Sequence, residues 1–458
     1  MILMPDEAIR KDDTHGSGAR RRFRLHVAWT VGARLLMTAN SVVAGVIVAR
    51  WLGAEGLGSL AVLNVMVATV VQLSSAGLPS ANTYFISRER GRLAAASLNS
   101  LLFALAAGGA LSLAVTLLAL WRPTVFSSIQ PQLVAVAALS IPFQLIAVLG
   151  LNIFLALGRV DRFNLLDLAS QSFVLLNAAL AVVVLGRGLW ALVSLNTAAS
   201  ILVALLIVWM IGRQVALEKE RRAPARYRPS ARLFGEMLRY GLKFHVSILA
   251  SILIFRADLL IVNHFRGAGE AGVYAVASQV AMMLILLPGV IGTLLMPRAA
   301  SERDERGELT MRATRHTAFV MLFICGLAAP ASYALPLLYG RAFTDATIQL
   351  LILLPGVYLV GIEAVLVQHF NSTGLPAAIP VFWLTTLLVN VALNLALVPA
   401  FGARGAAVAS TVSYALIFVL VASLFRMRTG NRLSTTLVLR GRELRELLTA
   451  SRAGASSR

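Results

Sequence analysis

The chain alternates between long apolar stretches and short polar connections. A helix needs about 20 mostly apolar residues to cross the hydrocarbon core of a membrane, and about twelve stretches reach that length. This pattern predicts an all-α integral membrane protein with about twelve transmembrane helices. Their approximate ranges are 26–48, 59–86, 93–120, 133–157, 164–185, 189–211, 240–263, 272–297, 313–338, 347–370, 377–398 and 404–425.

Composition excludes other classes of protein. Of the 458 residues, 58% are hydrophobic and only 14% are charged, whereas a soluble globular chain has about 25% charged residues. A soluble enzyme is therefore excluded, and the apolar content argues against a nucleic-acid partner despite the net charge of +20. The first 24 residues lack an apolar core, so no cleavable signal peptide is expected. The single cysteine, Cys325, cannot form an internal disulfide.

The positive charge is distributed very unequally between the two sides of the predicted membrane. Lysine and arginine accumulate in cytoplasmic loops. With a cytoplasmic N terminus, about 31 of the 41 Lys and Arg residues lie on the inner side and about six on the outer side. Both termini are therefore expected in the cytoplasm. The basic tail 426–458 has Leu437, Leu444 and Leu448 near one helical face, and we expect it to lie along the inner membrane surface.

The two halves of the chain share an ordered series of residues. Gly53, Gly58, Ala61 and Val62 recur as Gly267, Gly272, Ala275 and Val276, at a constant offset of 214. Further along, the offset drifts between 213 and 217 for Pro142 and Pro355, Phe154 and Phe370, Gly158 and Gly374, and Gly188 and Gly405. Small insertions would produce such a drift. The series indicates a repeat of six spans.

An even number of spans makes both copies insert the same way round. The copies are then two six-helix lobes related by a pseudo-twofold axis along the membrane normal, with a pathway between them. Such a plan describes an alternating-access transporter better than a channel or a scaffold. The predicted divisions are a basic N-terminal tail (1–24), an N-lobe (25–212), a basic cytoplasmic linker (213–238), a C-lobe (239–425) and a basic amphipathic tail (426–458).

Two spans carry arginines together with other polar residues at spacings that predict one shared helical face in each span. These residues are Arg34, Thr38 and Ser41 in the first span and His245, Arg256 and Asn263 in the seventh. An ionised side chain at membrane depth is costly unless it faces a cavity or a partner. Because the two spans are equivalent in the repeat, Arg34 and Arg256 are expected to meet in a central cavity and bind a phosphate or carboxylate. The alternative is that each arginine forms a buried ion pair or extends to the membrane surface.

Two carboxylates also lie within the predicted spans. Asp258 is about 200° round the helix from Arg256, so the two are not expected to pair. Asp258 and Glu363 are candidates for ion or proton coupling, and the alternative for each is a structural hydrogen-bonded carboxyl. The chain has no HExxH, GxSxG, P-loop or CxxC motif, and its predicted outer loops are short. We therefore expect no catalytic residue, no metal and no cofactor.

Three segments carry a resemblance to a known family: Ala49–Gly58, Arg256–Val262 and Gly267–Tyr274. In these segments and in its twelve-span, two-lobe plan, the chain resembles the polysaccharide transporter branch of the multidrug/oligosaccharidyl-lipid/polysaccharide (MOP) exporter superfamily. The resemblance implies a MATE-like fold. It further implies a flippase that moves an undecaprenyl-diphosphate-linked oligosaccharide across the bacterial cytoplasmic membrane, for O-antigen, exopolysaccharide or capsule biosynthesis.

The resemblance also implies which molecules would interact with the protein, and it leaves alternative functions open. The partners would be the lipid-linked oligosaccharide, membrane lipids, and the polysaccharide polymerase and glycosyltransferases of the same pathway. A cation-coupled multidrug antiporter of the same superfamily remains an alternative, although it should have a carboxylate deep in its first lobe. Within the predicted spans of that lobe, the one carboxylate is Asp167, near an inner end. The peptidoglycan-precursor flippase usually has two further spans. A polysaccharide polymerase or ligase is disfavoured by the short outer loops.

Overall fold

A computed structural model describes residues 16–126, 129–221, 228–301, 304, 306–374 and 376–431. The predicted surface tail beyond residue 431, with its three leucines, lies outside the described residues. So do residues 1–15 of the predicted N-terminal tail and residues 222–227 of the predicted linker.

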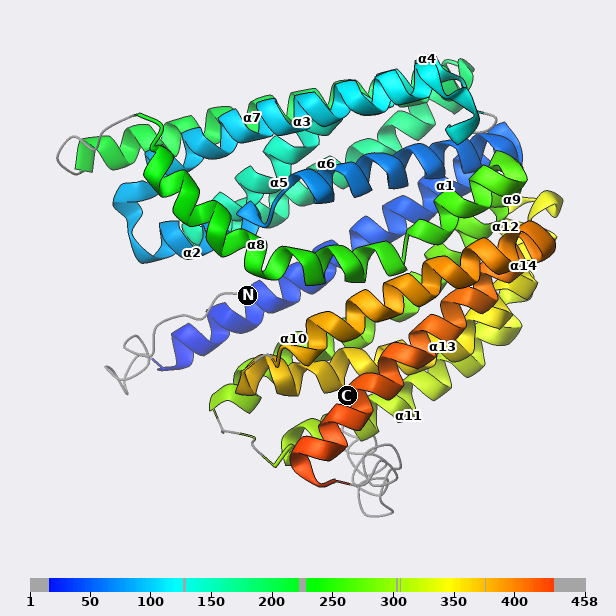
Figure 1. Cartoon of the computed structure of the whole chain (residues 1–458). Helices are drawn as coiled ribbons and strands as arrows, with labels where there is room; N and C mark the ends of the chain where they lie inside the picture. The colour runs from blue at the N-terminus through cyan, green and yellow to red at the C-terminus, as the bar shows by residue number, and fades with distance from the viewer. Residues whose placement is uncertain are drawn as a thin grey trace. The chain divides into compact units, whose positions relative to one another are not determined.

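The described part of the chain is helical and contains no β-strand (Figure 1). This confirms the prediction of an all-α membrane protein. The α-helices are α1 (Gly16–Ser74), α2 (Leu78–Arg88), α3 (Leu93–Trp121), α4 (Pro131–Ala138), α5 (Ile141–Ala156), α6 (Val160–Ala178), α7 (Gly188–Arg221), α8 (Ala231–Ile254), α9 (Ala257–Leu284), α10 (Leu286–Ser301), α11 (Glu308–Ala331), α12 (Leu335–Tyr339), α13 (Thr344–Thr373) and α14 (Ala378–Thr429). Short helical turns are η2 (Arg90–Arg92), η3 (Pro123–Phe126), η4 (Ala179–Val184), η5 (Ser332–Ala334) and η6 (Arg341–Phe343).

Nine segments of the described chain are long and apolar enough to cross a membrane. Some of them are too long for one crossing: the 52 residues of α14 would extend about 78 Å as a straight helix, against a hydrocarbon core of about 30 Å. A non-helical glycine, Gly402, divides α14 into two halves that run side by side (Figure 1). Across these halves, the Nδ2 of Asn390 donates to the Oγ of Ser413 at 3.1 Å. The nine segments therefore cross the membrane more than nine times in total, and the count of twelve transmembrane helices stays a prediction.

Prolines mark several interruptions of the predicted spans. Pro79, Pro142 and Pro288 lie within the first three residues of α2, α5 and α10, directly after a short break in the helix. Proline lacks an N–H and suits the first turn of a helix, where that donor has no partner. The predicted spans 59–86, 133–157 and 272–297 are therefore each made of two helices. Pro355, in contrast, lies inside the unbroken α13.

The chain divides into two compact units, residues 1–272 and 273–458. In the first, α5 contacts α1, α2, α3, α6 and α7; in the second, α13 contacts α10, α11, α12 and α14. In the most apolar window of the segments that contain α5 and α13, 61% of residues are buried. Pro142 lies on α5 and Pro355 on α13, so the repeat in the sequence already makes these two helices equivalent. Each unit is thus built round the same member of the repeat, while the predicted lobe boundaries stay a prediction.

The repeat is also visible in the backbone. Gly53 has φ 68° and its counterpart Gly267 has φ 84°, and each interrupts a long helix. Gly158 and Gly374 likewise both have positive φ, at 72° and 108°. Residues with a side chain rarely adopt this region, which glycine enters freely. The matched glycines therefore give the backbone a positive φ at equivalent points of both copies.

The segments after Gly53 and Gly267 contact each other within the first unit. A Cβ atom added to Gly58 would lie 1.7 Å from the carbonyl oxygen of Ala268, and one added to Gly272 would lie 2.0 Å from that of Ala54. Ala54 and Ala268 are themselves equivalent at the offset of 214, so the contact is reciprocal. The two backbones approach so closely that only glycine fits at either position.

We predict that Gly58→Ala destabilises the folded protein, because the methyl group must push the two backbones apart. Overpacking of this kind costs about 1–3 kcal/mol or more. The measurement is the midpoint of thermal unfolding in detergent. Gly269→Ala is the matched control, since a Cβ at this nearby helical glycine meets nothing within 4 Å. Equal unfolding midpoints for the two variants would contradict the close contact.

Candidate functional site

Arg34 lies on α1 with an exposed side chain. The hydroxyl of Thr38 donates to the backbone carbonyl of Arg34 at 2.8 Å, and Thr38 and Ser41 are both half-buried. Asp167 on α6 lies within electrostatic range of Arg34. Among the described residues, however, no carboxylate forms an ion pair with Arg34 by direct contact. The guanidinium is therefore available to an anionic ligand.

Arg256 lies at a break in the predicted seventh span. α8 ends at Ile254 and α9 begins at Ala257. The N–H groups of Phe255 and Arg256 donate to carbonyls three residues earlier, at 3.2 and 3.1 Å, which closes a tight turn. The Arg256 side chain is exposed and has no ion-pair partner in the part of the chain that the structure describes. It directly precedes the N-terminus of α9, whose helix dipole also favours negative charge.

The break corrects one expectation from the sequence. His245 and Asn263 are 6% and 1% exposed, whereas Arg256 is exposed. The prediction that these three residues share one helical face was wrong, because it assumed a continuous helix. The Nδ2 of Asn263 donates to the backbone carbonyl of Phe126 in η3 at 3.3 Å. Asn263 thus connects α9 to the segment that follows α3.

The two candidate coupling carboxylates are both buried. Asp258 is 2% exposed, and its Oδ1 accepts the N–H of Leu259 at 2.8 Å in the first turn of α9, where a carboxylate is favourable. Glu363 is 2% exposed on α13, the central helix of the second unit. Its Oε1 has no hydrogen-bond partner within the described residues. An unpaired carboxylate in such surroundings needs a proton or a cation to compensate its charge.

Sequence reasoning missed a polar pocket between α2 and α8, which we name the α2–α8 pocket. It has a volume of about 620 Å³ and is lined by Tyr84, Phe85, Arg88, Glu89, Arg92, Glu236, Arg239 and Tyr240. Two contacts hold the start of α8 against α3. The Nδ2 of Asn99 donates to the carbonyl of Ser230 at 3.0 Å, and the N–H of Ser230 donates to the Oδ1 of Asn99 at 3.1 Å. The hydroxyl of Ser230 also caps α8 by accepting the N–H of Leu233.

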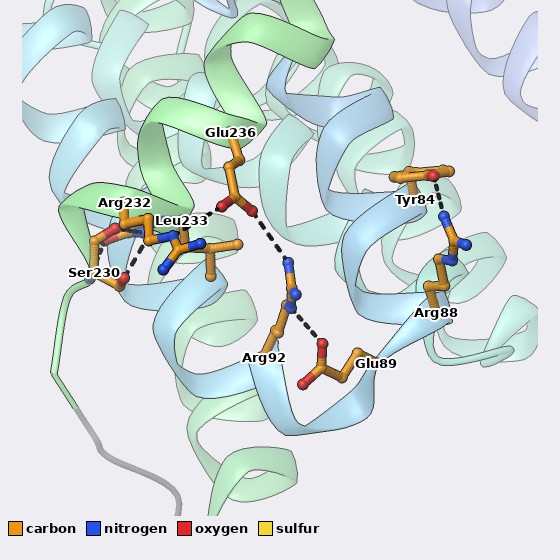
Figure 2. A network of polar contacts seen from close by, with 9 residues as sticks. Tyr84, Arg88, Glu89, Arg92, Ser230, Arg232, Leu233 and Glu236 are labelled. Carbon is orange, nitrogen blue, oxygen red and sulfur yellow. Dashed lines mark hydrogen bonds and ion pairs between the residues drawn. The ribbon is translucent and has the colours of Figure 1, made fainter.

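Glu236 lies between two arginines at the edge of this pocket (Figure 2). Arg92 contacts Glu236 at 3.4 Å and Glu89 at 2.6 Å, while Arg232 contacts Glu236 at 3.4 Å. Arg88 points instead toward the phenol of Tyr84 and donates to its oxygen. The sequence placed Arg88 and Arg92 only among the inner-side charges. A signal for the pocket was nevertheless present, since tyrosines accompany arginines in both 84–92 and 239–240.

Similarity to solved structures establishes the fold class. An inward-facing multidrug resistance MATE family transporter of the MOP superfamily matches with a TM-score of 0.71 at 15% identity, covering 88% of this chain and 98% of that one. The lipid II flippase MurJ in an inward closed conformation matches with a TM-score of 0.70 at 16% identity, covering 90% and 89%. At these identities the likeness shows the fold, which is that of MOP-superfamily membrane transporters.

The chain belongs to the polysaccharide biosynthesis protein family, whose model matches residues 47–348. This confirms the resemblance seen in the sequence. Among curated proteins it is similar to the succinoglycan biosynthesis transport protein ExoT of Rhizobium meliloti, at 24% identity over 70% of this chain and 63% of the relative. It is also similar to the probable flippase AglR of Haloferax volcanii, at 30% identity over 35% of each chain. The matched regions span less than two thirds of these relatives.

We predict that Asn263→Ala lowers the free energy of unfolding by about 1–3 kcal/mol. The loss follows because the Phe126 carbonyl loses its donor and the buried side chain leaves a small space. Chemical or thermal unfolding of the purified protein measures the effect. Asn371→Ala, at an exposed position near the end of α13, is the control and is expected to unfold like the wild type. An unchanged stability for Asn263→Ala would remove the structural role assigned to this contact.

Proposed function

We propose that the protein is a flippase that moves an undecaprenyl-diphosphate-linked oligosaccharide from the inner to the outer leaflet of a bacterial cytoplasmic membrane. The observation that carries this proposal is the pair Arg34 and Arg256. Both side chains are exposed and neither forms a direct ion pair among the described residues, in a chain of the polysaccharide biosynthesis family. A diphosphate requires cationic ligands that can donate several hydrogen bonds to its oxygens, and guanidinium groups supply them.

The electrical potential of the membrane favours transport in this direction. With an inside-negative potential of about 100 mV, moving about two negative charges outward releases roughly 4–5 kcal/mol. Alternating access between the lobes 25–212 and 239–425 would carry the headgroup across while the lipid chain remains in the bilayer. Both termini would lie in the cytoplasm. Glycosyltransferases would supply the substrate there, and a polymerase would consume it for O-antigen, exopolysaccharide or capsule on the other side.

A reconstituted flipping assay tests this function. Proteoliposomes contain the full chain and a defined undecaprenyl-diphosphate-linked oligosaccharide, and the measured quantity is the fraction of headgroups accessible from outside over time. We expect that fraction to equilibrate far faster than in protein-free vesicles. No acceleration, together with uptake of organic cations by the same vesicles, would identify a multidrug antiporter instead.

We predict that Arg34→Ala and Arg256→Ala each reduce the flipping rate at least about tenfold. Each variant removes charge-assisted hydrogen bonds to the diphosphate, which are worth about 1.5–3 kcal/mol. The same reconstituted assay measures the rates, with Arg187→Ala as a control because this exposed arginine lies in a predicted outer loop. Wild-type rates for both the Arg34 and the Arg256 variant would overturn the assignment of these two arginines.

We further predict that Glu363→Gln removes the dependence of flipping on a proton or cation gradient. The buried Oε1 has no hydrogen-bond partner in the described structure, and binding of a proton or cation would compensate its charge. Rates are measured with and without imposed pH and sodium gradients. Glu55→Gln, at an exposed carboxylate, is the control. An equal response to the gradients in Glu363→Gln and in the wild type would assign coupling elsewhere, Asp258 being the next candidate.

A further inference from the structure

The α2–α8 pocket contains arginines of two kinds. Arg92 is compensated by Glu89 and Glu236. Just outside the pocket, Arg90 is paired with Glu218 at 3.8 Å, and Arg232 with Glu236. Arg88 and Arg239 form no ion pair within the part of the chain that the structure describes, and both side chains are exposed. The pocket therefore has two guanidinium groups whose charge is not neutralised.

The aromatic side chains of the pocket hold Arg88 in place. The rings of Tyr84 and Tyr240 stack with their centroids 4.5 Å apart and their planes at 16°. The Arg88 guanidinium lies over the Tyr84 ring, 5.6 Å from its centroid, and donates to the Tyr84 hydroxyl. These contacts fix the guanidinium without cancelling its charge. A positioned, uncompensated arginine is well suited to bind phosphate.

The position of the pocket points to a ligand at the membrane surface. It lies at the end of α2, beside the arginine-rich turn that the charge distribution places on the cytoplasmic side. Tyrosines are enriched at the depth of the lipid headgroups, where the apolar ring contacts lipid and the hydroxyl contacts water. A volume of about 620 Å³ is within the range of small-ligand sites and accommodates a phosphorylated headgroup.

We propose that the α2–α8 pocket captures the diphosphate headgroup of the transported amphiphile at the cytoplasmic membrane surface, with Arg88 and Arg239 as phosphate ligands. This inference rests on the proposed function. It adds a site that is separate in the chain from Arg34 and Arg256. The pocket binds the headgroup before transport begins, and the stacked tyrosines form an aromatic wall beside it.

The experiment is arginine-specific labelling of the full chain in phosphatidylcholine nanodiscs. Phenylglyoxal modifies accessible arginines, and peptide mass mapping gives the rate at each position. Three ligands are compared at equal concentration: a polyprenyl-diphosphate-linked oligosaccharide, phosphatidylglycerol and inorganic diphosphate. We expect the first ligand to slow labelling of Arg88 and Arg239 about tenfold or more. Labelling of Arg232, whose side chain is 92% exposed on the same surface, should not change.

The two other ligands identify the source of the phosphate. Equal protection by phosphatidylglycerol would make the pocket a site for ordinary lipid headgroups, and equal protection by inorganic diphosphate would make it a site for soluble anions. Either result overturns its assignment to the transported amphiphile. Unchanged labelling of Arg88 and Arg239 with all three ligands, or equal protection of Arg232, also overturns it.

Variants separate this proposal from the proposed function. Arg88→Gln combined with Arg239→Gln is expected to raise the substrate concentration for half-maximal flipping about tenfold or more, while the rate at saturation is retained. Arg232→Gln is the matched control, and thermal unfolding verifies that each variant is folded. If the wild type protects Arg88 and Arg239 but does not flip the substrate, the proposed function fails and the capture site stands. If it flips the substrate without protecting them, only the capture site fails.

Discussion

Lipid offers no hydrogen-bond partner to the backbone, so each interruption of a helix at membrane depth must be satisfied within the protein. The structure meets this requirement with short turns. The N–H groups of Phe255 and Arg256 bond to carbonyls three residues earlier, and the N–H of Ser140 bonds in the same way to the carbonyl of Ala137. Because an unsatisfied break is costly, a break that does occur is informative. The one beside Arg256 places a cation and the N-terminus of a helix at the same point, which is an arrangement suited to an anion.

The same reasoning separates the arginines of this strongly basic chain. The positive charge as a whole is the basis of the predicted orientation in the membrane, and it says little about any one residue. Direct contacts distinguish them. Arg92 and Arg232 share Glu236, so their charges mainly stabilise the junction of the α2–α3 turn with α8. Exposed arginines without such a partner are the ones that can exchange water for a ligand.

Much of the fold could be predicted from the sequence, because the length of an apolar stretch is a strong local signal for a membrane helix. The repeat was also visible, since glycines with positive φ cannot readily be replaced and so keep their offset. The break at Phe255–Arg256 could not be predicted: the flanking residues include neither glycine nor proline. For the same reason the predicted face shared by His245, Arg256 and Asn263 was wrong. The α2–α8 pocket was missed because it joins residues about 150 positions apart, and no local pattern records that contact.

The reciprocal contact of Gly58 and Gly272 has a consequence for how the two copies can change. After a duplication, each copy is ordinarily free to diverge while the other keeps the original property. Here the glycine of each copy packs directly against the backbone of the equivalent segment in the other copy. A larger residue in either copy disturbs the same contact. The duplicated segments are therefore bound to a common requirement, and their similarity at these positions is imposed by mutual fit as well as by shared origin.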